Sequence, residues 1–180
     1  MMRSKAEHEV VMYAFLSTTI AELLVAAKDG RLVAIIMQEQ RDEEALVNEL
    51  HRRFPEAQLR HAATSMKPWA QAISDYVERP HADLALPLDI RGTAFQRKVW
   101  EHVLTVPFGT TTTFAEVAIA VGSPRAVRAV GNACTRNPLE FAIPCHRVLR
   151  SDGRFSGGSD WGDRRQETLV RREATSTRKR

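Results

Sequence analysis

The spacing of apolar and polar residues differs between the first and second halves of the chain. In the first half, three short apolar runs at residues 10–15, 22–27 and 31–37 are typical of strands. The turn-forming sequence Lys-Asp-Gly at residues 28–30 separates the last two runs, so these runs are predicted to pair as a hairpin. The pattern indicates a small sheet.

Two helices and a break follow in the same half. Residues 41–54 have apolar side chains three or four positions apart, and Pro55 ends this predicted helix. Residues 67–78 form a second predicted helix. Residues 79–92 contain two prolines and a glycine and interrupt the pattern. We therefore predict a domain boundary near residues 88–92.

The second half has the periodicity of helices. Thr93 can cap a helix whose apolar residues share one stripe. Thr113 and Glu116 have the spacing of a capping box at the start of the next helix, and Gly122 ends that helix. The stripe of the first helix consists of Phe95, Val99, Trp100, Val103 and Leu104.

A third helix is predicted directly after this glycine. Ser123 would cap it, Pro124 would lie in its first turn, and it would extend to residue 135. Two short helices joined by a tight turn are typical of a helix-turn-helix. The third helix carries Arg125 and Arg128 among small residues. Such a helix either packs in a core or approaches a narrow DNA groove with its arginines reaching into the duplex.

The predicted fold class is α+β. A small α/β N-terminal subdomain, residues 1–90, packs on a mostly helical C-terminal domain, residues 91–175, which contains the helix-turn-helix. Residues 176–180 form a basic tail that is expected to be disordered.

Composition narrows the classes of function. Two cysteines are too few for a disulfide framework, and they lack the paired spacing of a zinc site, so we expect no metal and no other cofactor. The charged N-terminal segment lacks the apolar run of a signal peptide, and no stretch approaches about 18 apolar residues. We expect a soluble cytoplasmic protein that has no contact with a membrane.

Charge is unevenly distributed between the two halves. Residues 1–90 contain ten Lys and Arg against fourteen Asp and Glu, whereas residues 91–180 contain sixteen against eight. A basic half beside an acidic half favours contact with a polyanion, most often nucleic acid. A merely solvated basic surface is the alternative.

Candidate chemistry centres on Cys145, which lies between Pro144 and the pair His146-Arg147. A buried cysteine is most often a packed thiol. Here the proline stiffens the loop, His146 can relay the thiol proton, and Arg147 is expected to favour the nucleophilic thiolate.

Two other chemistries are open to such a cysteine. A cysteine hydrolase requires an oxyanion hole and a triad, and a redox sensor requires an exposed thiol. Neither explains a helix-turn-helix ten residues upstream. A nucleophile beside a DNA-docking helix favours chemistry on a base that has left the stack.

The motifs around these residues resemble those of the O6-alkylguanine-DNA alkyltransferases. The resemblance covers about residues 10–174 and is greatest to the C-terminal half of the bacterial adaptive-response (Ada) alkyltransferases. It is carried by PCHRV at 144–148, RAVGNACTRNP at 128–138, RREA at 171–174, LPLDIRGTAFQRKVW at 86–100 and PFGTTTTFAEVA at 107–118.

The resemblance implies a ribonuclease-H-like N-terminal subdomain and a single-turnover reaction. Cys145 would accept the alkyl group from O6-alkylguanine, and from O4-alkylthymine, in double-stranded DNA. His146 would take the thiol proton through a water, and Glu173 would orient the imidazole. The partner would be the minor groove of the duplex, bound by a monomer, because a flipped base needs only one site.

The resemblance also implies roles in DNA and substrate binding. Arg128 would fill the space of the flipped nucleotide, Asn137 would brace the turn before the cysteine, and Ser156 would contact O6 of the base. Phe114, Arg125 and Phe155 complete the predicted DNA- and substrate-binding set.

Two positions depart from the family pattern. Phe114 stands where the family usually has a tyrosine, whose hydroxyl protonates the departing guanine. The loop at residues 155–162 is one residue longer and has Gly158 where an aromatic residue is expected. The alternative function is therefore a DNA lesion-binding module whose cysteine is not alkylated or is alkylated only slowly.

Overall fold

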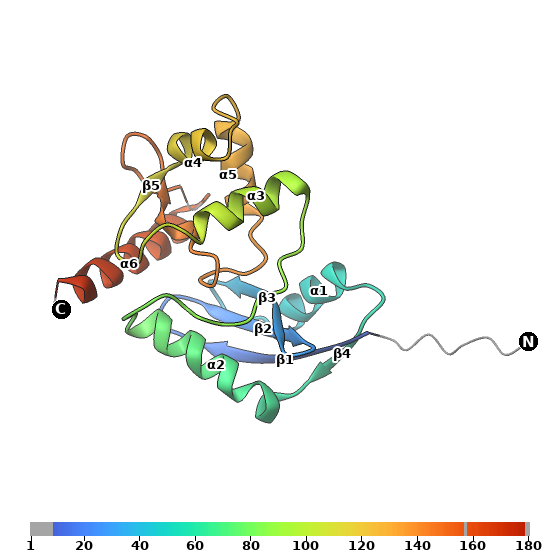
Figure 1. The fold of residues 1–180 in the computed structure, drawn as a ribbon. Helices are drawn as coiled ribbons and strands as arrows, with labels where there is room; N and C mark the ends of the chain where they lie inside the picture. The colour runs from blue at the N-terminus through green and yellow to red at the C-terminus, as the bar shows by residue number, and fades with distance from the viewer. Residues whose placement is uncertain (1–8, 157, 179–180) are drawn as a thin grey trace, which may run out of the picture.

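A four-stranded sheet lies at the base of the molecule (Figure 1). The structure, a computed structural model, describes residues 9–156 and 158–178. The strands are β1 (Val10–Ser17), β2 (Glu22–Lys28), β3 (Arg31–Gln38) and β4 (Gln58–His61), in the order β3-β2-β1-β4. The three predicted strands are confirmed. β4, a short edge strand parallel to β1, was not predicted, because its sequence QLRH has only one apolar residue.

The predicted hairpin of β2 and β3 is confirmed. Asp29 and Gly30, between these strands, both have positive φ, 49° and 70°. This is the backbone of a two-residue type I′ turn, which matches the right-handed twist of the paired strands. Both strands are apolar at successive positions because the two faces of the sheet are covered.

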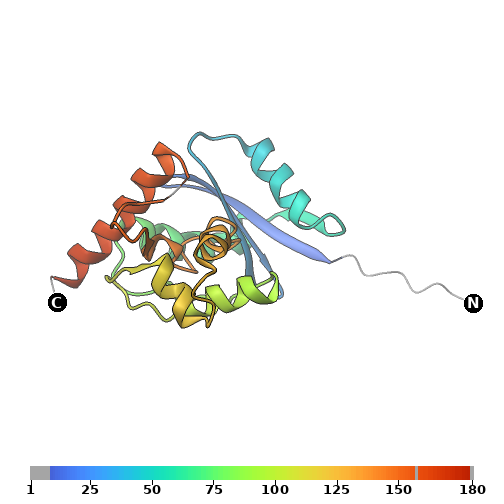
Figure 2. The same cartoon turned by 90° about the horizontal axis from the view of Figure 1, so that it is seen from above.

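The two faces are covered by different parts of the chain. Helix α1 (Glu43–Arg53) buries Leu46 and Leu50 against one face, and helix α2 (Ala63–Glu78) packs with the C-terminal half against the other (Figure 2). α2 begins four residues before the predicted start at residue 67. Met66 is fully buried, so the apolar stripe of α2 extends through the first turn and Pro68 lies inside the helix.

The second half is mostly helical, as predicted. Both predicted caps are confirmed, with Thr93 and Gln96 forming a full capping box and Thr113 and Glu116 another. A two-stranded parallel sheet, which was not predicted, joins the segment before α4 to the segment after the cysteine. The elements are α3 (Ala94–Val103), β5 (Thr112–Thr113), α4 (Phe114–Ala120), α5 (Val127–Thr135), the 3₁₀ turn η1 (Cys145–Arg147), β6 (Val148–Leu149) and α6 (Asp160–Thr177).

The predicted start of the third helix is wrong. Gly122 ends α4 with φ of 73°, and the amide of Ser123 donates to the carbonyl of Ala118, which is a Schellman ending. Residues 123–126 then form a turn closed by the amide of Ala126 and the carbonyl of Ser123, so α5 begins only at Val127. Arg125 therefore lies in the turn, and the two arginines do not share one helix.

The segment that links the two halves and the C-terminal half are both anchored to β3. The amide of Leu32 donates to the carbonyl of Pro87, and the amide of Ile35 donates to the carbonyl of Pro138. A single apolar cluster contains residues from β2, β3, α2, α3, α4, α5 and α6. The division of the chain into domains near residue 90 stays a prediction.

The tail prediction is partly wrong, because α6 continues to Thr177 and Arg178 is its C-terminal cap. Gly109 lies against this last part of the helix, with its amide bonded to Glu173 and its Cα close to the side chain of Thr177. Residues 179–180 lie outside the described residues. Among the residues that are described, no helix is long and apolar enough to cross a membrane.

Candidate active site

The loop that carries Cys145 is fixed to the end of α5 by Asn137. The side-chain amide of this buried asparagine donates to the carbonyl of Ile143 at 2.9 Å, and its oxygen accepts from the amide of Leu139 at 2.9 Å. These two bonds hold both ends of the loop that leads to the cysteine. Cys145 is the first residue of η1 and is 8% exposed.

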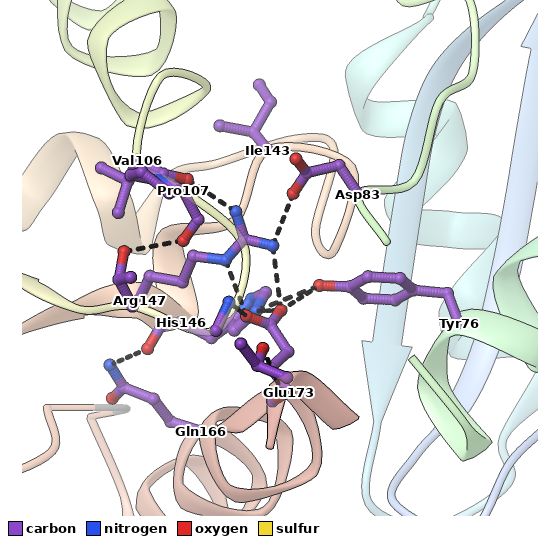
Figure 3. A network of polar contacts seen from close by, with 12 residues as sticks. Tyr76, Asp83, Val106, Pro107, Ile143, His146, Arg147, Gln166 and Glu173 are labelled. Atoms are coloured by element: carbon purple, nitrogen blue, oxygen red, sulfur yellow. Dashed lines mark hydrogen bonds and ion pairs between the residues drawn. The ribbon is translucent and has the colours of Figure 1, made fainter. Parts of the chain in front are cut away.

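His146 and Glu173 form a buried pair between η1 and α6 (Figure 3). His146 Nε2 lies 2.7 Å from Glu173 Oε1, and the other ring nitrogen, Nδ1, has no hydrogen-bond partner among the residues that the structure describes. The carboxylate can only accept, so Nε2 is assigned the proton. The lone pair of Nδ1 is therefore available to accept a proton.

The charges of this pair suit a general base. Burial lowers the pKa of His146, and Glu173 opposes this only in part, so the imidazole is neutral at neutral pH. For Glu173, burial raises the pKa, but hydrogen bonds from His146, Arg147 and Tyr76, together with the charge that His146 carries when it is protonated, outweigh burial and lower the pKa to about 2. At neutral pH an ionised carboxylate is therefore hydrogen-bonded to a neutral imidazole.

Arg147 does not serve the sulfur as predicted. Its guanidinium is buried and engaged with Glu173 Oε2 at 2.9 Å, Asp83 Oδ1 at 2.7 Å and the carbonyl of Val106 at 2.8 Å (Figure 3). The pKa of the Cys145 thiol is raised, mainly by a hydrogen bond with Cys134 and secondly by burial. The cysteine is therefore a thiol in the resting protein and needs a base to become a nucleophile.

A pocket lies over the cysteine and continues into a surface groove. The groove shares Phe114, Thr135 and Ser156 with the pocket and adds Arg128 and Arg150. It leads from the exposed face of α5 to the sulfur. The pocket is lined by Phe114, Cys134, Thr135, Glu140, Cys145, His146, Val148, Ser156, Arg165, Gln166 and Leu169.

Comparison with known proteins identifies the family. Residues 94–175 match the family model described as the 6-O-methylguanine DNA methyltransferase, DNA binding domain. The chain is 33% identical over 149 residues to the constitutive methylated-DNA–protein-cysteine methyltransferase of Bacillus subtilis, covering 81% of this chain and 84% of that protein. The chain belongs to the O6-methylguanine-DNA methyltransferase family.

Other members of the family match more of the chain. The bifunctional transcriptional activator/DNA repair enzyme Ada of Escherichia coli is 40% identical over 172 residues, which is 96% of this chain and 48% of that protein. The chain thus spans about half the length of this curated relative. A crystal structure of the Mycobacterium tuberculosis O6-methylguanine methyltransferase has a TM-score of 0.78 at 30% identity, covering 92% of this chain and 94% of the other.

A further Mycobacterium tuberculosis structure of this family was determined in complex with DNA. It has a TM-score of 0.74 at 27% identity and covers 93% of this chain and 94% of the other. Together these comparisons confirm the resemblance to the alkyltransferases and the α+β fold.

The structure brings together most, but not all, of the predicted site residues. Cys145, His146, Phe114 and Ser156 line the pocket, and Glu173 supports it from below through His146. Arg128 lies at the mouth, on the exposed face of α5.

Two predicted binding residues lie elsewhere. Arg125 is exposed in the turn before α5 and is absent from the described linings of the pocket and groove. Phe155 lines a separate hollow with Arg150 and Gly153. Gly158 has φ of 82° and open space around its Cα, whereas Gly157 of the predicted pocket loop lies outside the described residues.

Sequence reasoning missed several groups that hold the site. Gln166 donates to the carbonyls of His146 and Val148 at 3.0 Å each and accepts from the amide of Ser156 at 2.9 Å. It therefore ties the loop at Ser156 to the turn η1 and the strand β6. The position of Gln166 in an amphipathic helix predicts only that it lies near the core. It does not predict its hydrogen-bond partners, because the carbonyls that it binds are 18 and 20 residues away in the chain.

The sequence predicts no role for Gly109, which lies in the motif at residues 107–118. Its amide donates to Glu173 Oε2 at 3.1 Å, its φ is 76°, and a Cβ there would lie 2.2 Å from Thr177 Oγ1. Only glycine fits so close to α6 with that backbone. The PFGT motif thus supplies one of the donors that hold the carboxylate.

Proposed function

We propose that this protein repairs DNA by transferring the methyl or other alkyl group of O6-alkylguanine to Sγ of its own Cys145, once per molecule. Membership of the family supports the reaction class. The single observation that carries the proposal is that the Cys145 thiol shares a pocket with His146, whose Nδ1 is unpartnered among the described residues and whose Nε2 is held by Glu173. The same displacement applies to the alkoxy carbon of O4-alkylthymine, which we include as a second substrate.

The reaction begins with removal of the thiol proton. His146 Nδ1 accepts this proton through a water, and the imidazolium that forms is stabilised by Glu173 in the manner of a catalytic triad. The thiolate then attacks the alkyl carbon in line with the leaving O6. The C–O bond breaks as the C–S bond forms, and the guanine anion takes a proton from solvent, which leaves a thioether on Cys145.

The surface around the pocket suits a DNA partner. We propose that α5 docks in the minor groove of the duplex, with its exposed Val127, Arg128 and Ala129 toward the DNA. The target base leaves the stack, enters along the groove between α5 and the 150–156 loop, and reaches the sulfur. Arg128 fills the vacated space. One site per base is sufficient, so we propose that a monomer acts.

A reducing compartment fits the two thiols. Cys134 and Cys145 are both free and buried, and they share the pocket. Alkyl transfer needs Cys145 as a thiol, so we place the protein in the cytoplasm, where thiols stay reduced.

The test is an intact-mass measurement. Stoichiometric protein is incubated with a duplex that carries O6-methylguanine, and we expect a gain of one methylene that peptide mapping assigns to Cys145. An unchanged mass with retained DNA binding would contradict alkyl transfer and favour the lesion-binding alternative. That alternative is motivated by Phe114, which lacks the hydroxyl of the tyrosine that is usual in the family.

A further inference from the structure

We propose that Tyr76, in helix α2 of the N-terminal half, is a positioning residue for alkyl transfer that fixes the tautomer of His146 through Glu173. The proposal rests on the proposed function, since it concerns the base of that reaction. No motif of the C-terminal half contains Tyr76, which lies 70 residues before His146 and 97 before Glu173.

Three polar atoms, one each from Tyr76, His146 and Glu173, form a closed triangle (Figure 3). Tyr76 Oη lies 2.5 Å from Glu173 Oε1 and 3.2 Å from His146 Nε2, and Nε2 lies 2.7 Å from the same Oε1. The rings of Tyr76 and His146 meet edge to face with centroids 6.3 Å apart. All three side chains are buried, so water does not compete for these contacts.

The protons in this triangle can be assigned one by one. Burial, followed by the charge and hydrogen bond of Glu173, raises the pKa of the Tyr76 phenol, which therefore keeps its proton. That proton is donated to Oε1. The phenol oxygen then presents lone pairs to Nε2, as the carboxylate does. Both neighbours of Nε2 are acceptors, so Nε2 carries hydrogen and Nδ1 is bare.

The other tautomer is excluded by the same contacts. It would place the lone pair of Nε2 against a carboxylate oxygen and leave a buried Nδ1–H without an acceptor among the described residues. Tyr76 thus contributes to keeping the basic nitrogen of His146 unprotonated and ready for the thiol proton. It does so from the opposite half of the molecule, which makes α2 part of the active-site support.

Tyr76 also tempers the basicity of Glu173. Glu173 Oε1 accepts hydrogen bonds from Tyr76, His146 and Arg147, so each donor reduces the negative charge that is available to the other two. The ionisable groups around His146 are Tyr76 from α2, Glu173 and Arg165 from α6, Cys145 and Arg147 from its own turn, and Cys134 of α5 and Glu140, which line the same pocket. Loss of the phenol hydroxyl leaves more negative charge for His146, so the pKa of the imidazole should rise.

The test is the single-turnover rate of methyl transfer as a function of pH in wild type and Tyr76→Phe, which keeps the ring. We expect the rate at neutral pH to fall about three- to tenfold, the size expected for one lost buried hydrogen bond. The midpoint of the acid limb should move to higher pH by roughly half a unit. Tyr13→Phe is the matched control, because Tyr13 is the other tyrosine of the chain and packs in the cluster beside α1. It should change neither quantity.

Two further measurements separate positioning from packing. In a Glu173→Gln background, the effect of Tyr76→Phe should largely disappear, whereas a packing role would persist there. The ¹⁵N shifts of His146 in the wild type should report the Nε2–H tautomer at neutral pH, a reading that needs no variant to fold. An Nδ1–H tautomer would overturn the proposal, as would an unchanged rate and acid limb in a folded Tyr76→Phe protein. If the wild type itself fails to accept methyl, the proposed function is wrong instead.

Discussion

Helix α5 ends ten residues before the turn that carries Cys145, yet the outer face of this helix and the turn are built in opposite ways. In the turn, Cys145, His146 and Arg147 are all buried, and the partners of the last two come from α2, α6 and distant loops. On α5, Val127, Arg128 and Ala129 are exposed. In the function that we propose, chemistry therefore depends on a buried hydrogen-bond network, whereas DNA contact depends on exposed side chains.

This difference predicts that chemistry and DNA binding can be separated by substitution. The largest effect is expected from Cys145→Ala, which removes the only proposed alkyl acceptor and should abolish transfer. DNA affinity should change less than about twofold, because a buried sulfur contributes little to an electrostatic docking surface. The measurements are intact mass after incubation with an O6-methylguanine duplex and DNA affinity by anisotropy.

Cys134→Ala is the matched control for this prediction. Cys134 is free, buried and part of the same pocket, but it lies on α5 and has no imidazole beside it in sequence. We expect the Cys134→Ala protein to accept methyl. Methyl found on Cys134 in the wild type would show that the acceptor is wrongly assigned.

The next largest effect is expected inside the network, from Glu173→Gln. An amide cannot stabilise the imidazolium of His146 as a carboxylate does, so the transfer rate should fall about 100-fold. The buried guanidinium of Arg147 also loses its main counter-charge, although Asp83 remains, so the free energy of unfolding should fall by about 3 kcal/mol. Single-turnover kinetics and urea denaturation measure the two effects.

The same carboxylate gives a pH signature with a defined sign. The pKa of Glu173 is about 2 in the folded protein and about 4.3 in an unfolded chain. Its stabilising contribution is therefore complete above pH 4.5 or so and is lost as the pH falls toward 2. Wild type should lose stability over this range more steeply than Glu173→Gln. Glu167→Gln, on the more exposed side of α6 and paired with Arg171, should follow the wild type.

These buried partners mark the limit of what the sequence could predict. Local signals worked where the partner is local: the Asp29-Gly30 turn and the capping boxes at Thr93 and Thr113 are set by residues within three positions. The predicted start of α5 is wrong because Ser123 does not cap a helix: its amide completes the ending of α4, and its carbonyl closes the turn with Ala126.

The active site shows the same limit. Cys145 and His146 could be found because they are adjacent in a motif, whereas the hydroxyl of Tyr76 points at a carboxylate 97 residues away. Its place on the apolar stripe of α2 predicts burial and nothing about its partner. Arg147 was recognised as a charge near sulfur, but the acceptors that hold it, Asp83 and Val106, are brought to it only by the fold.

On the surface that we propose to face DNA, Arg128→Ala should slow repair of duplex substrate about 20-fold and repair of free O6-benzylguanine less than twofold. Unpairing and unstacking a base costs a few kcal/mol, which the arginine offsets only when there is a stack to fill. Rates on both substrates, measured with the same protein, check this. Equal losses would indicate damage to the active site itself.

Arg125→Ala provides the comparison within the same surface. Arg125 is exposed in the turn before α5, away from the groove that leads to the cysteine. We expect it to weaken duplex binding and to lower its salt dependence without a specific loss of repair at saturating DNA. A repair defect as large as that of Arg128→Ala would mean that the turn, and not α5 alone, enters the duplex.

The smallest effect is expected where the two regions meet, at Phe114. Its ring lines both the buried pocket and the surface groove. As the alkyl carbon moves to sulfur, negative charge grows on the guanine, and a donor aimed at the ring would stabilise this charge only as it develops. A phenyl ring offers stacking but no proton. Phe114→Tyr should therefore raise the single-turnover rate about tenfold, which is about 1.4 kcal/mol, the low end of general-acid effects because water replaces part of the donor.

The control for this gain is Phe155→Tyr, in the separate hollow beside Arg150, which should leave the rate unchanged. DNA affinity is measured for both variants. A tyrosine that only improved DNA binding would lower the protein concentration needed for saturation and would leave the activation barrier of methyl transfer unchanged. If Phe114→Tyr is no faster at saturating protein, with fold and affinity unchanged, another group already protonates the leaving guanine. The site would then be complete without the hydroxyl, and the departure at Phe114 would affect only how the base stacks as it enters the pocket.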